Sequence, residues 1–581
     1  MLICLTDYSD MQLQADQTRD RLNQILCVLA VLLSVLASLP FVEAGVNDDW
    51  IYAHMALSMT RTGHFAYESA TNATILVQTY LGSFLIHQFG FSFELLRFST
   101  LPFAAGCGIL CYRLALMAGL TSASSLFGSL TFVASPIFVP LAASFMSDMD
   151  ACFFMLLSLY CGAQASRIER SRRQRILWLM AAVLVGYAGG LERQTAYFAP
   201  GSVLAWAMWR WRRDGVMLRA ALCMAFVLGT GACLAVYWQT HLPIPADDVR
   251  VYPSSLRLAA TYPARFILTV TLFILPAMAR IGNGRFRLPV RFYTISALFV
   301  IGGFVLYWRV SHHLLFPWEP NMITQWGILS SGTEMRGEKP VVLNREWRLA
   351  ITLAVLIVLV RIGSVLVEYL SRSWLDAPGP VLWAKGLWRT LSEVTATTQM
   401  LAIFGALNFA FLLVRSRTFT FDRYLLPLVP VAIIAALLVT QNPSDRSVRS
   451  ANWVLLLIFS LYGIASTHDY FAALQARVTA FEKVEALGVA PRNIAGGLEL
   501  DGWTQSEITS RVQSTAPRPS KPDTIYARNW FSVLAPDIDP RYYLSWSDEP
   551  GLKRAAVGGV SFWAWLPPFR REVKILVPDH P

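Results

Sequence analysis

Long apolar runs recur from Ile25 to Ala465, and the sequence that follows them is polar. A membrane whose hydrocarbon core is about 30 Å thick needs about 20 apolar residues for each crossing helix. A helix also satisfies its own backbone hydrogen bonds in lipid, which an isolated strand or loop cannot do. Only 15% of the residues are charged, whereas soluble domains carry roughly a quarter. We therefore predict an all-α polytopic membrane protein.

The apolar runs predict about thirteen transmembrane helices. The predicted spans are Ile25–Val42, Phe98–Leu116, Leu126–Ala143, Met149–Gly162, Ile176–Leu191, Ala196–Met208, Ala220–Trp238, Phe266–Met278, Phe292–Trp308, Leu349–Val367, Met400–Val414, Leu425–Val439 and Trp453–Ala465. A further run, Leu76–Phe93, contains Gln78, His87 and Gln88, and we interpret it as a helix in the outer membrane interface. The alternative is a full crossing, which would move the arginine cluster at residues 167–175 to the outside.

Clusters of arginine and lysine between the spans predict the orientation of the chain, because cytoplasmic loops carry an excess of these residues. The clusters are Arg167–Arg175, Arg210–Arg213, Arg280–Arg291, Arg372–Arg389 and Arg446–Arg449. With thirteen spans and a cytoplasmic N-terminus, every cluster faces the cytoplasm, and we expect the protein in the inner (plasma) membrane. These loops also account for the net charge of +11, so no nucleic-acid partner is expected.

The chain is expected to divide into three parts. Residues 1–24 form a cytoplasmic segment, residues 25–466 the transmembrane domain with external loops at 43–97 and 310–348, and residues 467–581 an extracytoplasmic domain. The last part opens with a helical pattern and continues with β-like runs at Tyr542–Leu544 and Val573–Val577. It is therefore predicted to be a small α/β domain.

Charged side chains gather at the outer ends of the predicted spans. They are the acidic pair Asp48-Asp49 with Tyr52 nearby, Ser147-Asp148, Glu192-Arg193-Gln194 and Asp422-Arg423. A carboxylate in such a place can take a proton from an attacking hydroxyl or hold a cation near a phosphate. A guanidinium group binds phosphate oxygens bidentately. Their shared position on one face of the membrane predicts a single site.

Each of these groups also has a simpler interpretation. The acidic pair suits a helix end that faces water, Asp148 suits a helix N-cap, and Arg193 can pair with Glu192 alone. His312-His313 lacks the partner spacing of a zinc site. The sequence contains no glycine-rich phosphate loop, which argues against direct use of a nucleotide. A divalent cation stays open as a cofactor.

Short motifs spread over residues 25–505 point to a family. They are Asp48-Asp49-Trp50-Ile51-Tyr52-Ala53 followed by Thr62-Gly63, Ser135-Pro136 with Ser147-Asp148, Arg193-Gln194, Arg423–Pro427, Thr467–Tyr470, Gly496–Glu499 and Asp501–Trp503. In these motifs the chain resembles the C-type (GT-C) superfamily of integral-membrane glycosyltransferases, which includes protein O-mannosyltransferases and the aminoarabinose transferases of lipid A. It departs from the family at Asp49, where Glu is frequent, and near Gln78-Thr79-Tyr80, which lacks a Pro-Pro or His-Pro element.

The resemblance implies transfer of a hexosyl or pentosyl group from a polyprenyl-phosphate-linked donor to a lipid, glycan or protein acceptor on the outer face. It implies catalytic roles for Asp48 and Asp49, binding of the donor phosphate by Arg193, Gln194 and Arg423, and supporting roles for Tyr52, Asp148 and Asp422. The alternatives are a polytopic lipid or polysaccharide transporter and a lipid-linked glycan polymerase or ligase. Transporters tend to place ionisable residues in mid-membrane and to carry internal repeats, and the sequence shows neither.

The arginine distribution generates a prediction for topology. A reporter fused after Ala465 should read extracytoplasmic, and one fused near Arg172 should read cytoplasmic, because the basic clusters hold their loops inside. A phosphatase and fluorescent-protein fusion pair at each position measures this. The same side reported at both positions would refute the span count.

Overall fold

The computed structural model describes residues 2–579 except 69–70, 72, 242–260, 279–287, 313, 330–333, 377–378, 380–385, 387–391, 416–419, 441–449 and 510–534, with side chains from residue 17 onward. Of the sequence features above, His313, residues 280–287 of the cluster Arg280–Arg291, residues 377–378, 380–385 and 387–389 of the cluster Arg372–Arg389, and the whole cluster Arg446–Arg449 lie outside the described residues.

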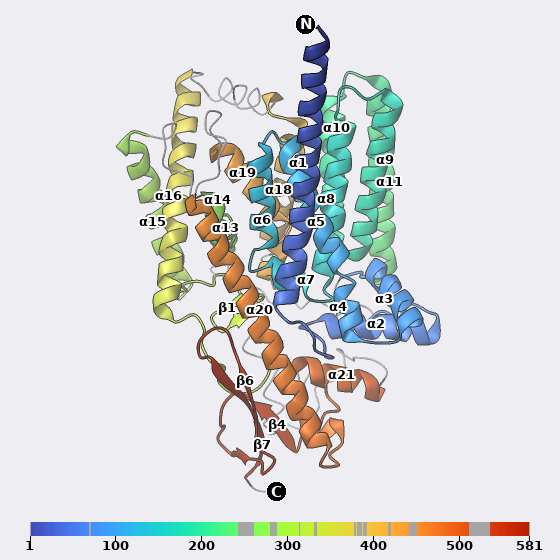
Figure 1. Cartoon of the computed structure of the whole chain (residues 1–581), viewed down its shortest axis with the longest axis vertical. Helices are drawn as coiled ribbons and strands as arrows, with labels where there is room; N and C mark the ends of the chain where they lie inside the picture. Colours follow the sequence, from blue (N-terminus) through green and yellow to red (C-terminus); the bar gives the residue numbers. More distant parts are fainter. Residues whose placement is uncertain are drawn as a thin grey trace.

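Long helices running roughly parallel form the body of the molecule, with the two termini at opposite ends (Figure 1). The helices up to residue 240 are α1 (Leu2–Ala37), α2 (Asp49–Thr62), α3 (Leu76–Phe89), α4 (Phe93–Phe98), α5 (Leu101–Met117), α6 (Ser122–Val133), α7 (Phe138–Ala142), α8 (Ser147–Ala165), α9 (Arg172–Glu192), the 3-10 helix η1 (Gln194–Tyr197), α10 (Phe198–Arg210) and α11 (Gly215–Thr240). Those that follow are α13 (Tyr262–Phe273), α14 (Leu275–Met278), α15 (Val290–Val310), α16 (Arg345–Asp376), α18 (Ala396–Arg415), the 3-10 helix η2 (Asp422–Leu425), α19 (Leu428–Thr440), α20 (Ser450–Glu485), the 3-10 helix η3 (Pro491–Asn493) and α21 (Leu498–Thr509).

Within the described part of the chain, eight helices are long and apolar enough to cross a membrane. The count of thirteen spans is not confirmed, because several predicted spans are shorter or broken. The predicted span Leu126–Ala143 consists of α6 and α7 with Ser135-Pro136 between them. Proline lacks the backbone N–H that a continuous helix needs. The 12 residues of α6 extend only about 18 Å, well below the thickness of the hydrocarbon core.

Within the segment Leu76–Phe93, Phe93 begins α4, and the first 14 residues form the separate helix α3. Its length of about 21 Å is too short for a crossing. It packs beside α2 at the end of the bundle that faces the C-terminal part of the chain (Figure 1). This arrangement agrees with an interfacial helix, which stays a prediction.

Close packing of α9 on η1 and α10 fixes the end of α9. A Cβ atom on Gly186 would lie 2.4 Å from the ring of Pro200, and one on Gly190 would lie 2.2 Å from the ring of Tyr197. Small residues let helices approach closely in this way. The two glycines therefore position the residues that follow α9, Arg193 and Gln194.

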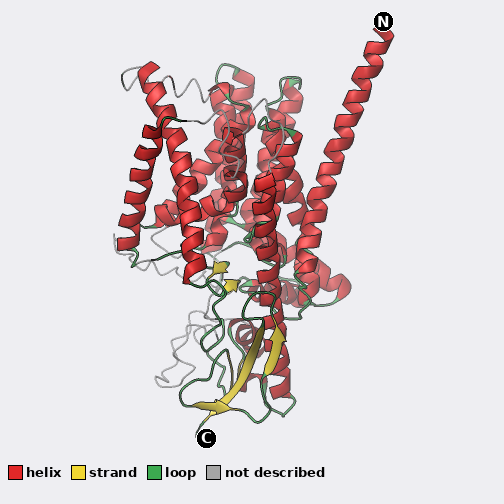
Figure 2. Ribbon diagram, turned by 60° about the vertical axis from the view of Figure 1, so that its left-hand side comes forward, coloured by secondary structure: helices red, strands yellow, loops and turns green. Residues whose placement is uncertain are grey.

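The chain after residue 466 continues the last long helix without a break, since α20 spans the boundary in one run of 36 residues. The short strands β1 (Ile323–Thr324) and β2 (Gly327–Ile328) precede it. The later strands are β3 (Ile494–Ala495), β4 (Tyr542–Ser545), β5 (Leu552–Arg554), β6 (Val560–Trp563) and β7 (Arg570–Pro578). They form one sheet in the order β3-β4-β7-β5, with β6 also paired to β7. Figure 2 shows the strands confined to this end of the molecule, so the predicted helix-and-strand content of the C-terminal region is confirmed.

Candidate active site

A cavity of about 500 Å³ lies where the ends of α2, α8, α9 and α18 meet η2. Its polar lining includes Asp48, Tyr52, Asp148, Arg193, Gln194, Asn408, Arg415, Arg423 and Tyr424. Six of the eight residues selected from the sequence are among them. The segments that carry these side chains are far apart in sequence, and the cavity exists only because the bundle brings them together.

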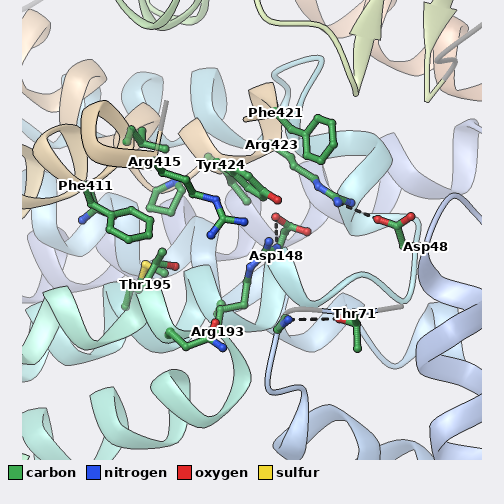
Figure 3. A pocket seen from close by; sticks show the side chains of 18 of the residues that line it. Asp48, Thr71, Asp148, Arg193, Thr195, Phe411, Arg415, Phe421, Arg423 and Tyr424 are labelled. Carbon is green, nitrogen blue, oxygen red and sulfur yellow. Dashed lines mark hydrogen bonds and ion pairs between the residues drawn. The ribbon is translucent and has the colours of Figure 1, made fainter. Parts of the chain in front are cut away.

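Asp48 and Arg423 form an ion pair across the cavity (Figure 3), with 2.7 Å between Asp48 Oδ2 and Arg423 Nη2. Asp48 immediately precedes α2, and Arg423 lies in η2. The side chain of Arg423 is 6% exposed, whereas that of Asp48 is 32% exposed. The guanidinium group thus orients the carboxylate from the protein side, and a ligand in the cavity can still reach the carboxylate.

A second ion pair lies beside the first. Arg193, which follows α9, contacts the carboxylate of Asp148 in the first turn of α8. Glu192 helps to place Arg193, because its backbone carbonyl accepts the N–H of Ile75 and its side chain accepts the N–H of Gln78, each at 3.0 Å. These bonds connect the end of α9 to the start of α3.

Tyr424 stands among three guanidinium groups. The distances from its ring centroid are 5.3 Å to Arg193, 5.4 Å to Arg415 and 5.8 Å to Arg423. An aromatic ring attracts cations over its face, so Tyr424 holds like charges close together. Sequence reasoning missed both Tyr424 and Arg415. Their signals were present: Tyr424 lies inside the quoted motif, and Arg415 follows directly on a predicted span.

The charge balance of the cavity favours an anion. Its lining contains three guanidinium groups (Arg193, Arg415, Arg423) and two carboxylates (Asp48, Asp148), which leaves one net positive charge. Each carboxylate already faces an arginine. Among the residues that the structure describes, no three His, Cys, Asp or Glu side chains gather as metal ligands would. The donor set therefore suits a phosphate better than a divalent cation.

A buried arginine of α4 binds the backbone of the loop that carries Asp48. Arg97, 1% exposed, donates to the carbonyl oxygens of Pro40, Val42 and Ala44 at 2.6, 3.1 and 2.8 Å. The backbone groups of this irregular segment need partners because they are buried. Arg97 donates hydrogen bonds to three of these carbonyl groups and fixes the path of the chain toward Asp48.

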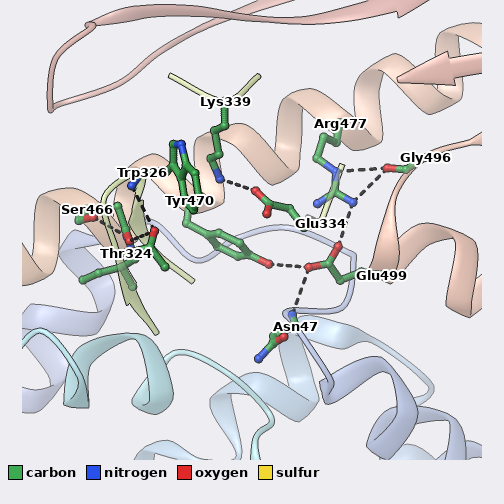
Figure 4. Close-up of polar contacts among 12 residues, drawn as sticks. Asn47, Thr324, Trp326, Glu334, Lys339, Ser466, Tyr470, Arg477, Gly496 and Glu499 are labelled. Carbon is green, nitrogen blue, oxygen red and sulfur yellow. Dashed lines mark hydrogen bonds and ion pairs between the residues drawn. The ribbon is translucent and has the colours of Figure 1, made fainter. Parts of the chain in front are cut away.

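The C-terminal part of the chain also holds this loop (Figure 4). Glu499 in α21 accepts the backbone N–H of Asn47 at 3.3 Å and the hydroxyl of Tyr470 at 3.1 Å through Oε1. Its other oxygen, Oε2, accepts from Arg477 at 2.9 Å. Close packing adds to this contact, since a Cβ atom on Gly502 would lie 2.4 Å from the ring of Trp50. The residue next to Asp48 is thus bound to α21.

The structure places Asp49 and Asp422, two further residues selected from the sequence, outside the cavity lining. Asp49 is 1% exposed and accepts the backbone N–H groups of Val46 and Phe145. Burial raises the pKa of Asp49 to about 7, against the opposing effect of Arg97. Asp422 accepts the N–H groups of Met322 and Ile323, both at 2.8 Å. Burial raises the pKa of Asp422 to about 7 as well.

Both carboxylates therefore organise the backbone around the site. Asp49 joins the start of α2 to Phe145, just before α8, and α8 carries Asp148. Asp422 joins the loop at residues 310–348 to η2, which carries Arg423. Their neighbours in the sequence, Asp48 and Arg423, face the cavity instead.

No protein-family model and no curated protein matches the chain. Among solved structures it is similar to ArnT from Cupriavidus metallidurans bound to undecaprenyl phosphate, at 13% identity and a TM-score of 0.39, over 95% of this chain and 97% of that one. It is also similar to the oligosaccharyltransferase AglB from Archaeoglobus fulgidus in complex with an inhibitory peptide and a dolichol-phosphate, at 14% identity and a TM-score of 0.43, over 90% of this chain and 64% of that one. A third is the S. cerevisiae protein O-mannosyltransferase Pmt1-Pmt2 complex bound to the sugar donor, at 14% identity and a TM-score of 0.30, over 38% of this chain and 32% of that one. Likenesses this distant carry no weight for the function, which has to be inferred from the site itself.

The contact between Glu499 and Asn47 generates a prediction. Glu499→Ala should make the backbone amides of residues 45–50 exchange with deuterium roughly 5–10-fold faster, because one hydrogen bond contributes about 1 kcal/mol. Hydrogen-exchange mass spectrometry measures this. Glu549→Ala is the matched control, since Glu549 pairs with Arg336 away from the loop. Unchanged exchange at 45–50 in Glu499→Ala would show that α21 does not hold the loop.

Proposed function

We propose that the protein is a membrane glycosyltransferase that moves a sugar from a polyprenyl-phosphate-linked donor to an acceptor hydroxyl at the end of the bundle where the cavity lies. The observation that carries this proposal is the pairing of an accessible carboxylate, Asp48, with a cluster of guanidinium groups in one cavity. The carboxylate can accept a proton, and the guanidinium groups can bind a phosphate. Glycosyl transfer from a lipid phosphate needs both.

In the proposed reaction, the acceptor oxygen attacks the anomeric carbon of the donor sugar. The bond between that carbon and the phosphate oxygen breaks, and the acceptor proton passes to Asp48. A hydroxyl is a weak nucleophile near neutral pH, so a positioned carboxylate that removes its proton accelerates the attack. Arg423 holds Asp48 in place through the 2.7 Å ion pair.

The departing lipid phosphate gains negative charge as the bond breaks. Arg193 and Arg423 lie on the cavity wall with Gln194 nearby, and guanidinium groups that face a developing anion stabilise the transition state. Arg415 and Tyr424 extend this basic surface. The acceptor is a lipid, a glycan or a protein, and Tyr52 and Asp148 complete the wall against which it binds.

The position of the charges favours this proposal over transport. The cavity lies at the end of the helical bundle and is lined by residues at helix ends, such as Asp48, Arg193 and Arg415. A transporter places its binding site near the membrane midplane. A lipid-linked glycan polymerase or ligase would use the same face, and the identity of the labelled product distinguishes it from the transferase.

The role of Asp48 is tested by a pair of neighbouring variants. Asp48→Asn keeps the shape and removes the base, so the rate of sugar transfer from radiolabelled polyprenyl-phosphate sugars should fall about 10²–10⁴-fold. Asp49→Asn should reduce the rate less, because Asp49 acts through the backbone at Val46 and Phe145. Membrane accumulation of each variant is the control. A wild-type rate in Asp48→Asn would end this mechanism and favour the transporter.

Binding of the donor phosphate is tested at Arg193. Arg193→Ala should raise the KM for the donor roughly 10–100-fold, since hydrogen bonds to charged groups contribute about 1.5–3 kcal/mol. Arg193→Lys should cost less, because it keeps the charge that faces Asp148 but loses the bidentate contact. Arg172→Ala, an exposed arginine that pairs with Asp214, should leave the KM unchanged. Unaltered donor kinetics in Arg193→Ala would remove Arg193 from the site.

A further inference from the structure

The turn that joins β6 to β7 leaves large aromatic side chains uncovered. Trp563 is 71% exposed, Trp565 is 47% exposed and Phe569 is 54% exposed. Such a group of apolar side chains on a surface marks a place where another apolar partner binds. Figure 1 shows the end of this hairpin directed toward the helical body, where β6 packs beside α20.

The turn is attached firmly to α20. The carboxylate of Asp469 accepts the backbone N–H groups of Trp565 and Leu566 at 2.6 and 3.0 Å, and it pairs with Arg571 at 3.2 Å. The rings of His468 and Trp565 stack with 4.0 Å between their centroids. The turn is therefore held at the position of residues 468–469 along the axis of α20.

The same residues lie just beyond the exposed apolar part of α20. The exposed apolar side chains of this helix include Val454, Leu457 and Leu461, of which Leu461 is the last. His468 follows Leu461 by seven residues, so it lies on the same stripe of the helix. The distance along the axis is about 10 Å. The headgroup layer on each side of the hydrocarbon core is about 5–8 Å thick, and α20 is inclined to the long axis of the molecule in Figure 1.

We propose that the turn between β6 and β7 lies in the headgroup layer of the membrane and anchors the C-terminal domain to the lipid surface. Tryptophan is favoured at this depth because its ring is amphipathic. Arg570, the exposed residue that follows Phe569, is placed to reach lipid phosphates. The partner is the lipid bilayer itself, because the aromatic group continues the lipid-facing stripe of α20.

A photo-crosslinking amino acid tests this contact in the full chain. Phe569→p-benzoylphenylalanine, reconstituted in vesicles of phosphatidylethanolamine and phosphatidylglycerol and irradiated, should give a lipid adduct that mass spectrometry detects on the peptide. Leu457, 57% exposed on α20, is the position expected to react with lipid. Lys553 is the matched control on the same sheet: it pairs with Val577, about 23 Å along β7 from Arg570, and should give no lipid adduct.

Each outcome decides the proposal. A lipid adduct at 569 and 457 but not at 553 supports it. An adduct at 457 alone, or a crosslink from 569 to a second copy of the chain, overturns it. In an Asp469→Asn background the adduct at 569 should fall several-fold while that at 457 persists, because the amide loses the pairing with Arg571 that fixes the turn. An unchanged yield at 569 would overturn the claim that α20 sets its depth. No activity enters these measurements, so they stand apart from the proposed glycosyl transfer.

Discussion

The ion pair between Asp48 and Arg423 joins two segments that are 375 positions apart in the sequence. Taking a charge out of water costs several kcal/mol unless a partner of opposite charge accompanies it. Arg423 is almost fully buried, so it requires Asp48, and the segment between α1 and α2 has to approach η2 for the pair to form. The pair of Arg193 and Asp148 imposes the same requirement on α8 and α9. These two ion pairs bring together the segments that form the cavity.

An ion pair of this kind keeps its geometry only if both backbones are fixed. Arg97 binds three carbonyl groups before Asp48, and Glu499 binds the N–H just before it. Asp422 fixes η2 through two backbone bonds. The described lining of the cavity ends at Pro427, yet Glu499 lies far beyond it in sequence. The described part of the C-terminal region therefore supports the site without lining the cavity.

The sequence predicted where the charges gather, because each motif lies at the end of an apolar run and the positive clusters assign those ends to one face. It could not predict which member of an acidic or charged pair enters the cavity. Asp48 and Asp49 are adjacent, and the carboxylate of Asp49 is turned away by a local contact with Val46 and a long-range contact with Phe145. The count of thirteen spans is not confirmed for a different reason. Hydropathy does not show the break between α6 and α7, so the apolar run Leu126–Ala143 predicts one helix where the structure has two.

The continuity of α20 connects the membrane to the site. Asp469 fixes the turn between β6 and β7, and the next residue, Tyr470, donates to Glu499. Arg477, seven residues later, lies on the same face as Tyr470 and binds the other oxygen of Glu499. Two turns of one helix thus carry both the proposed lipid anchor and the support of the loop with Asp48. Because a helix transmits position rigidly over this distance, α20 couples the proposed anchor to the placement of the Asp48 carboxylate.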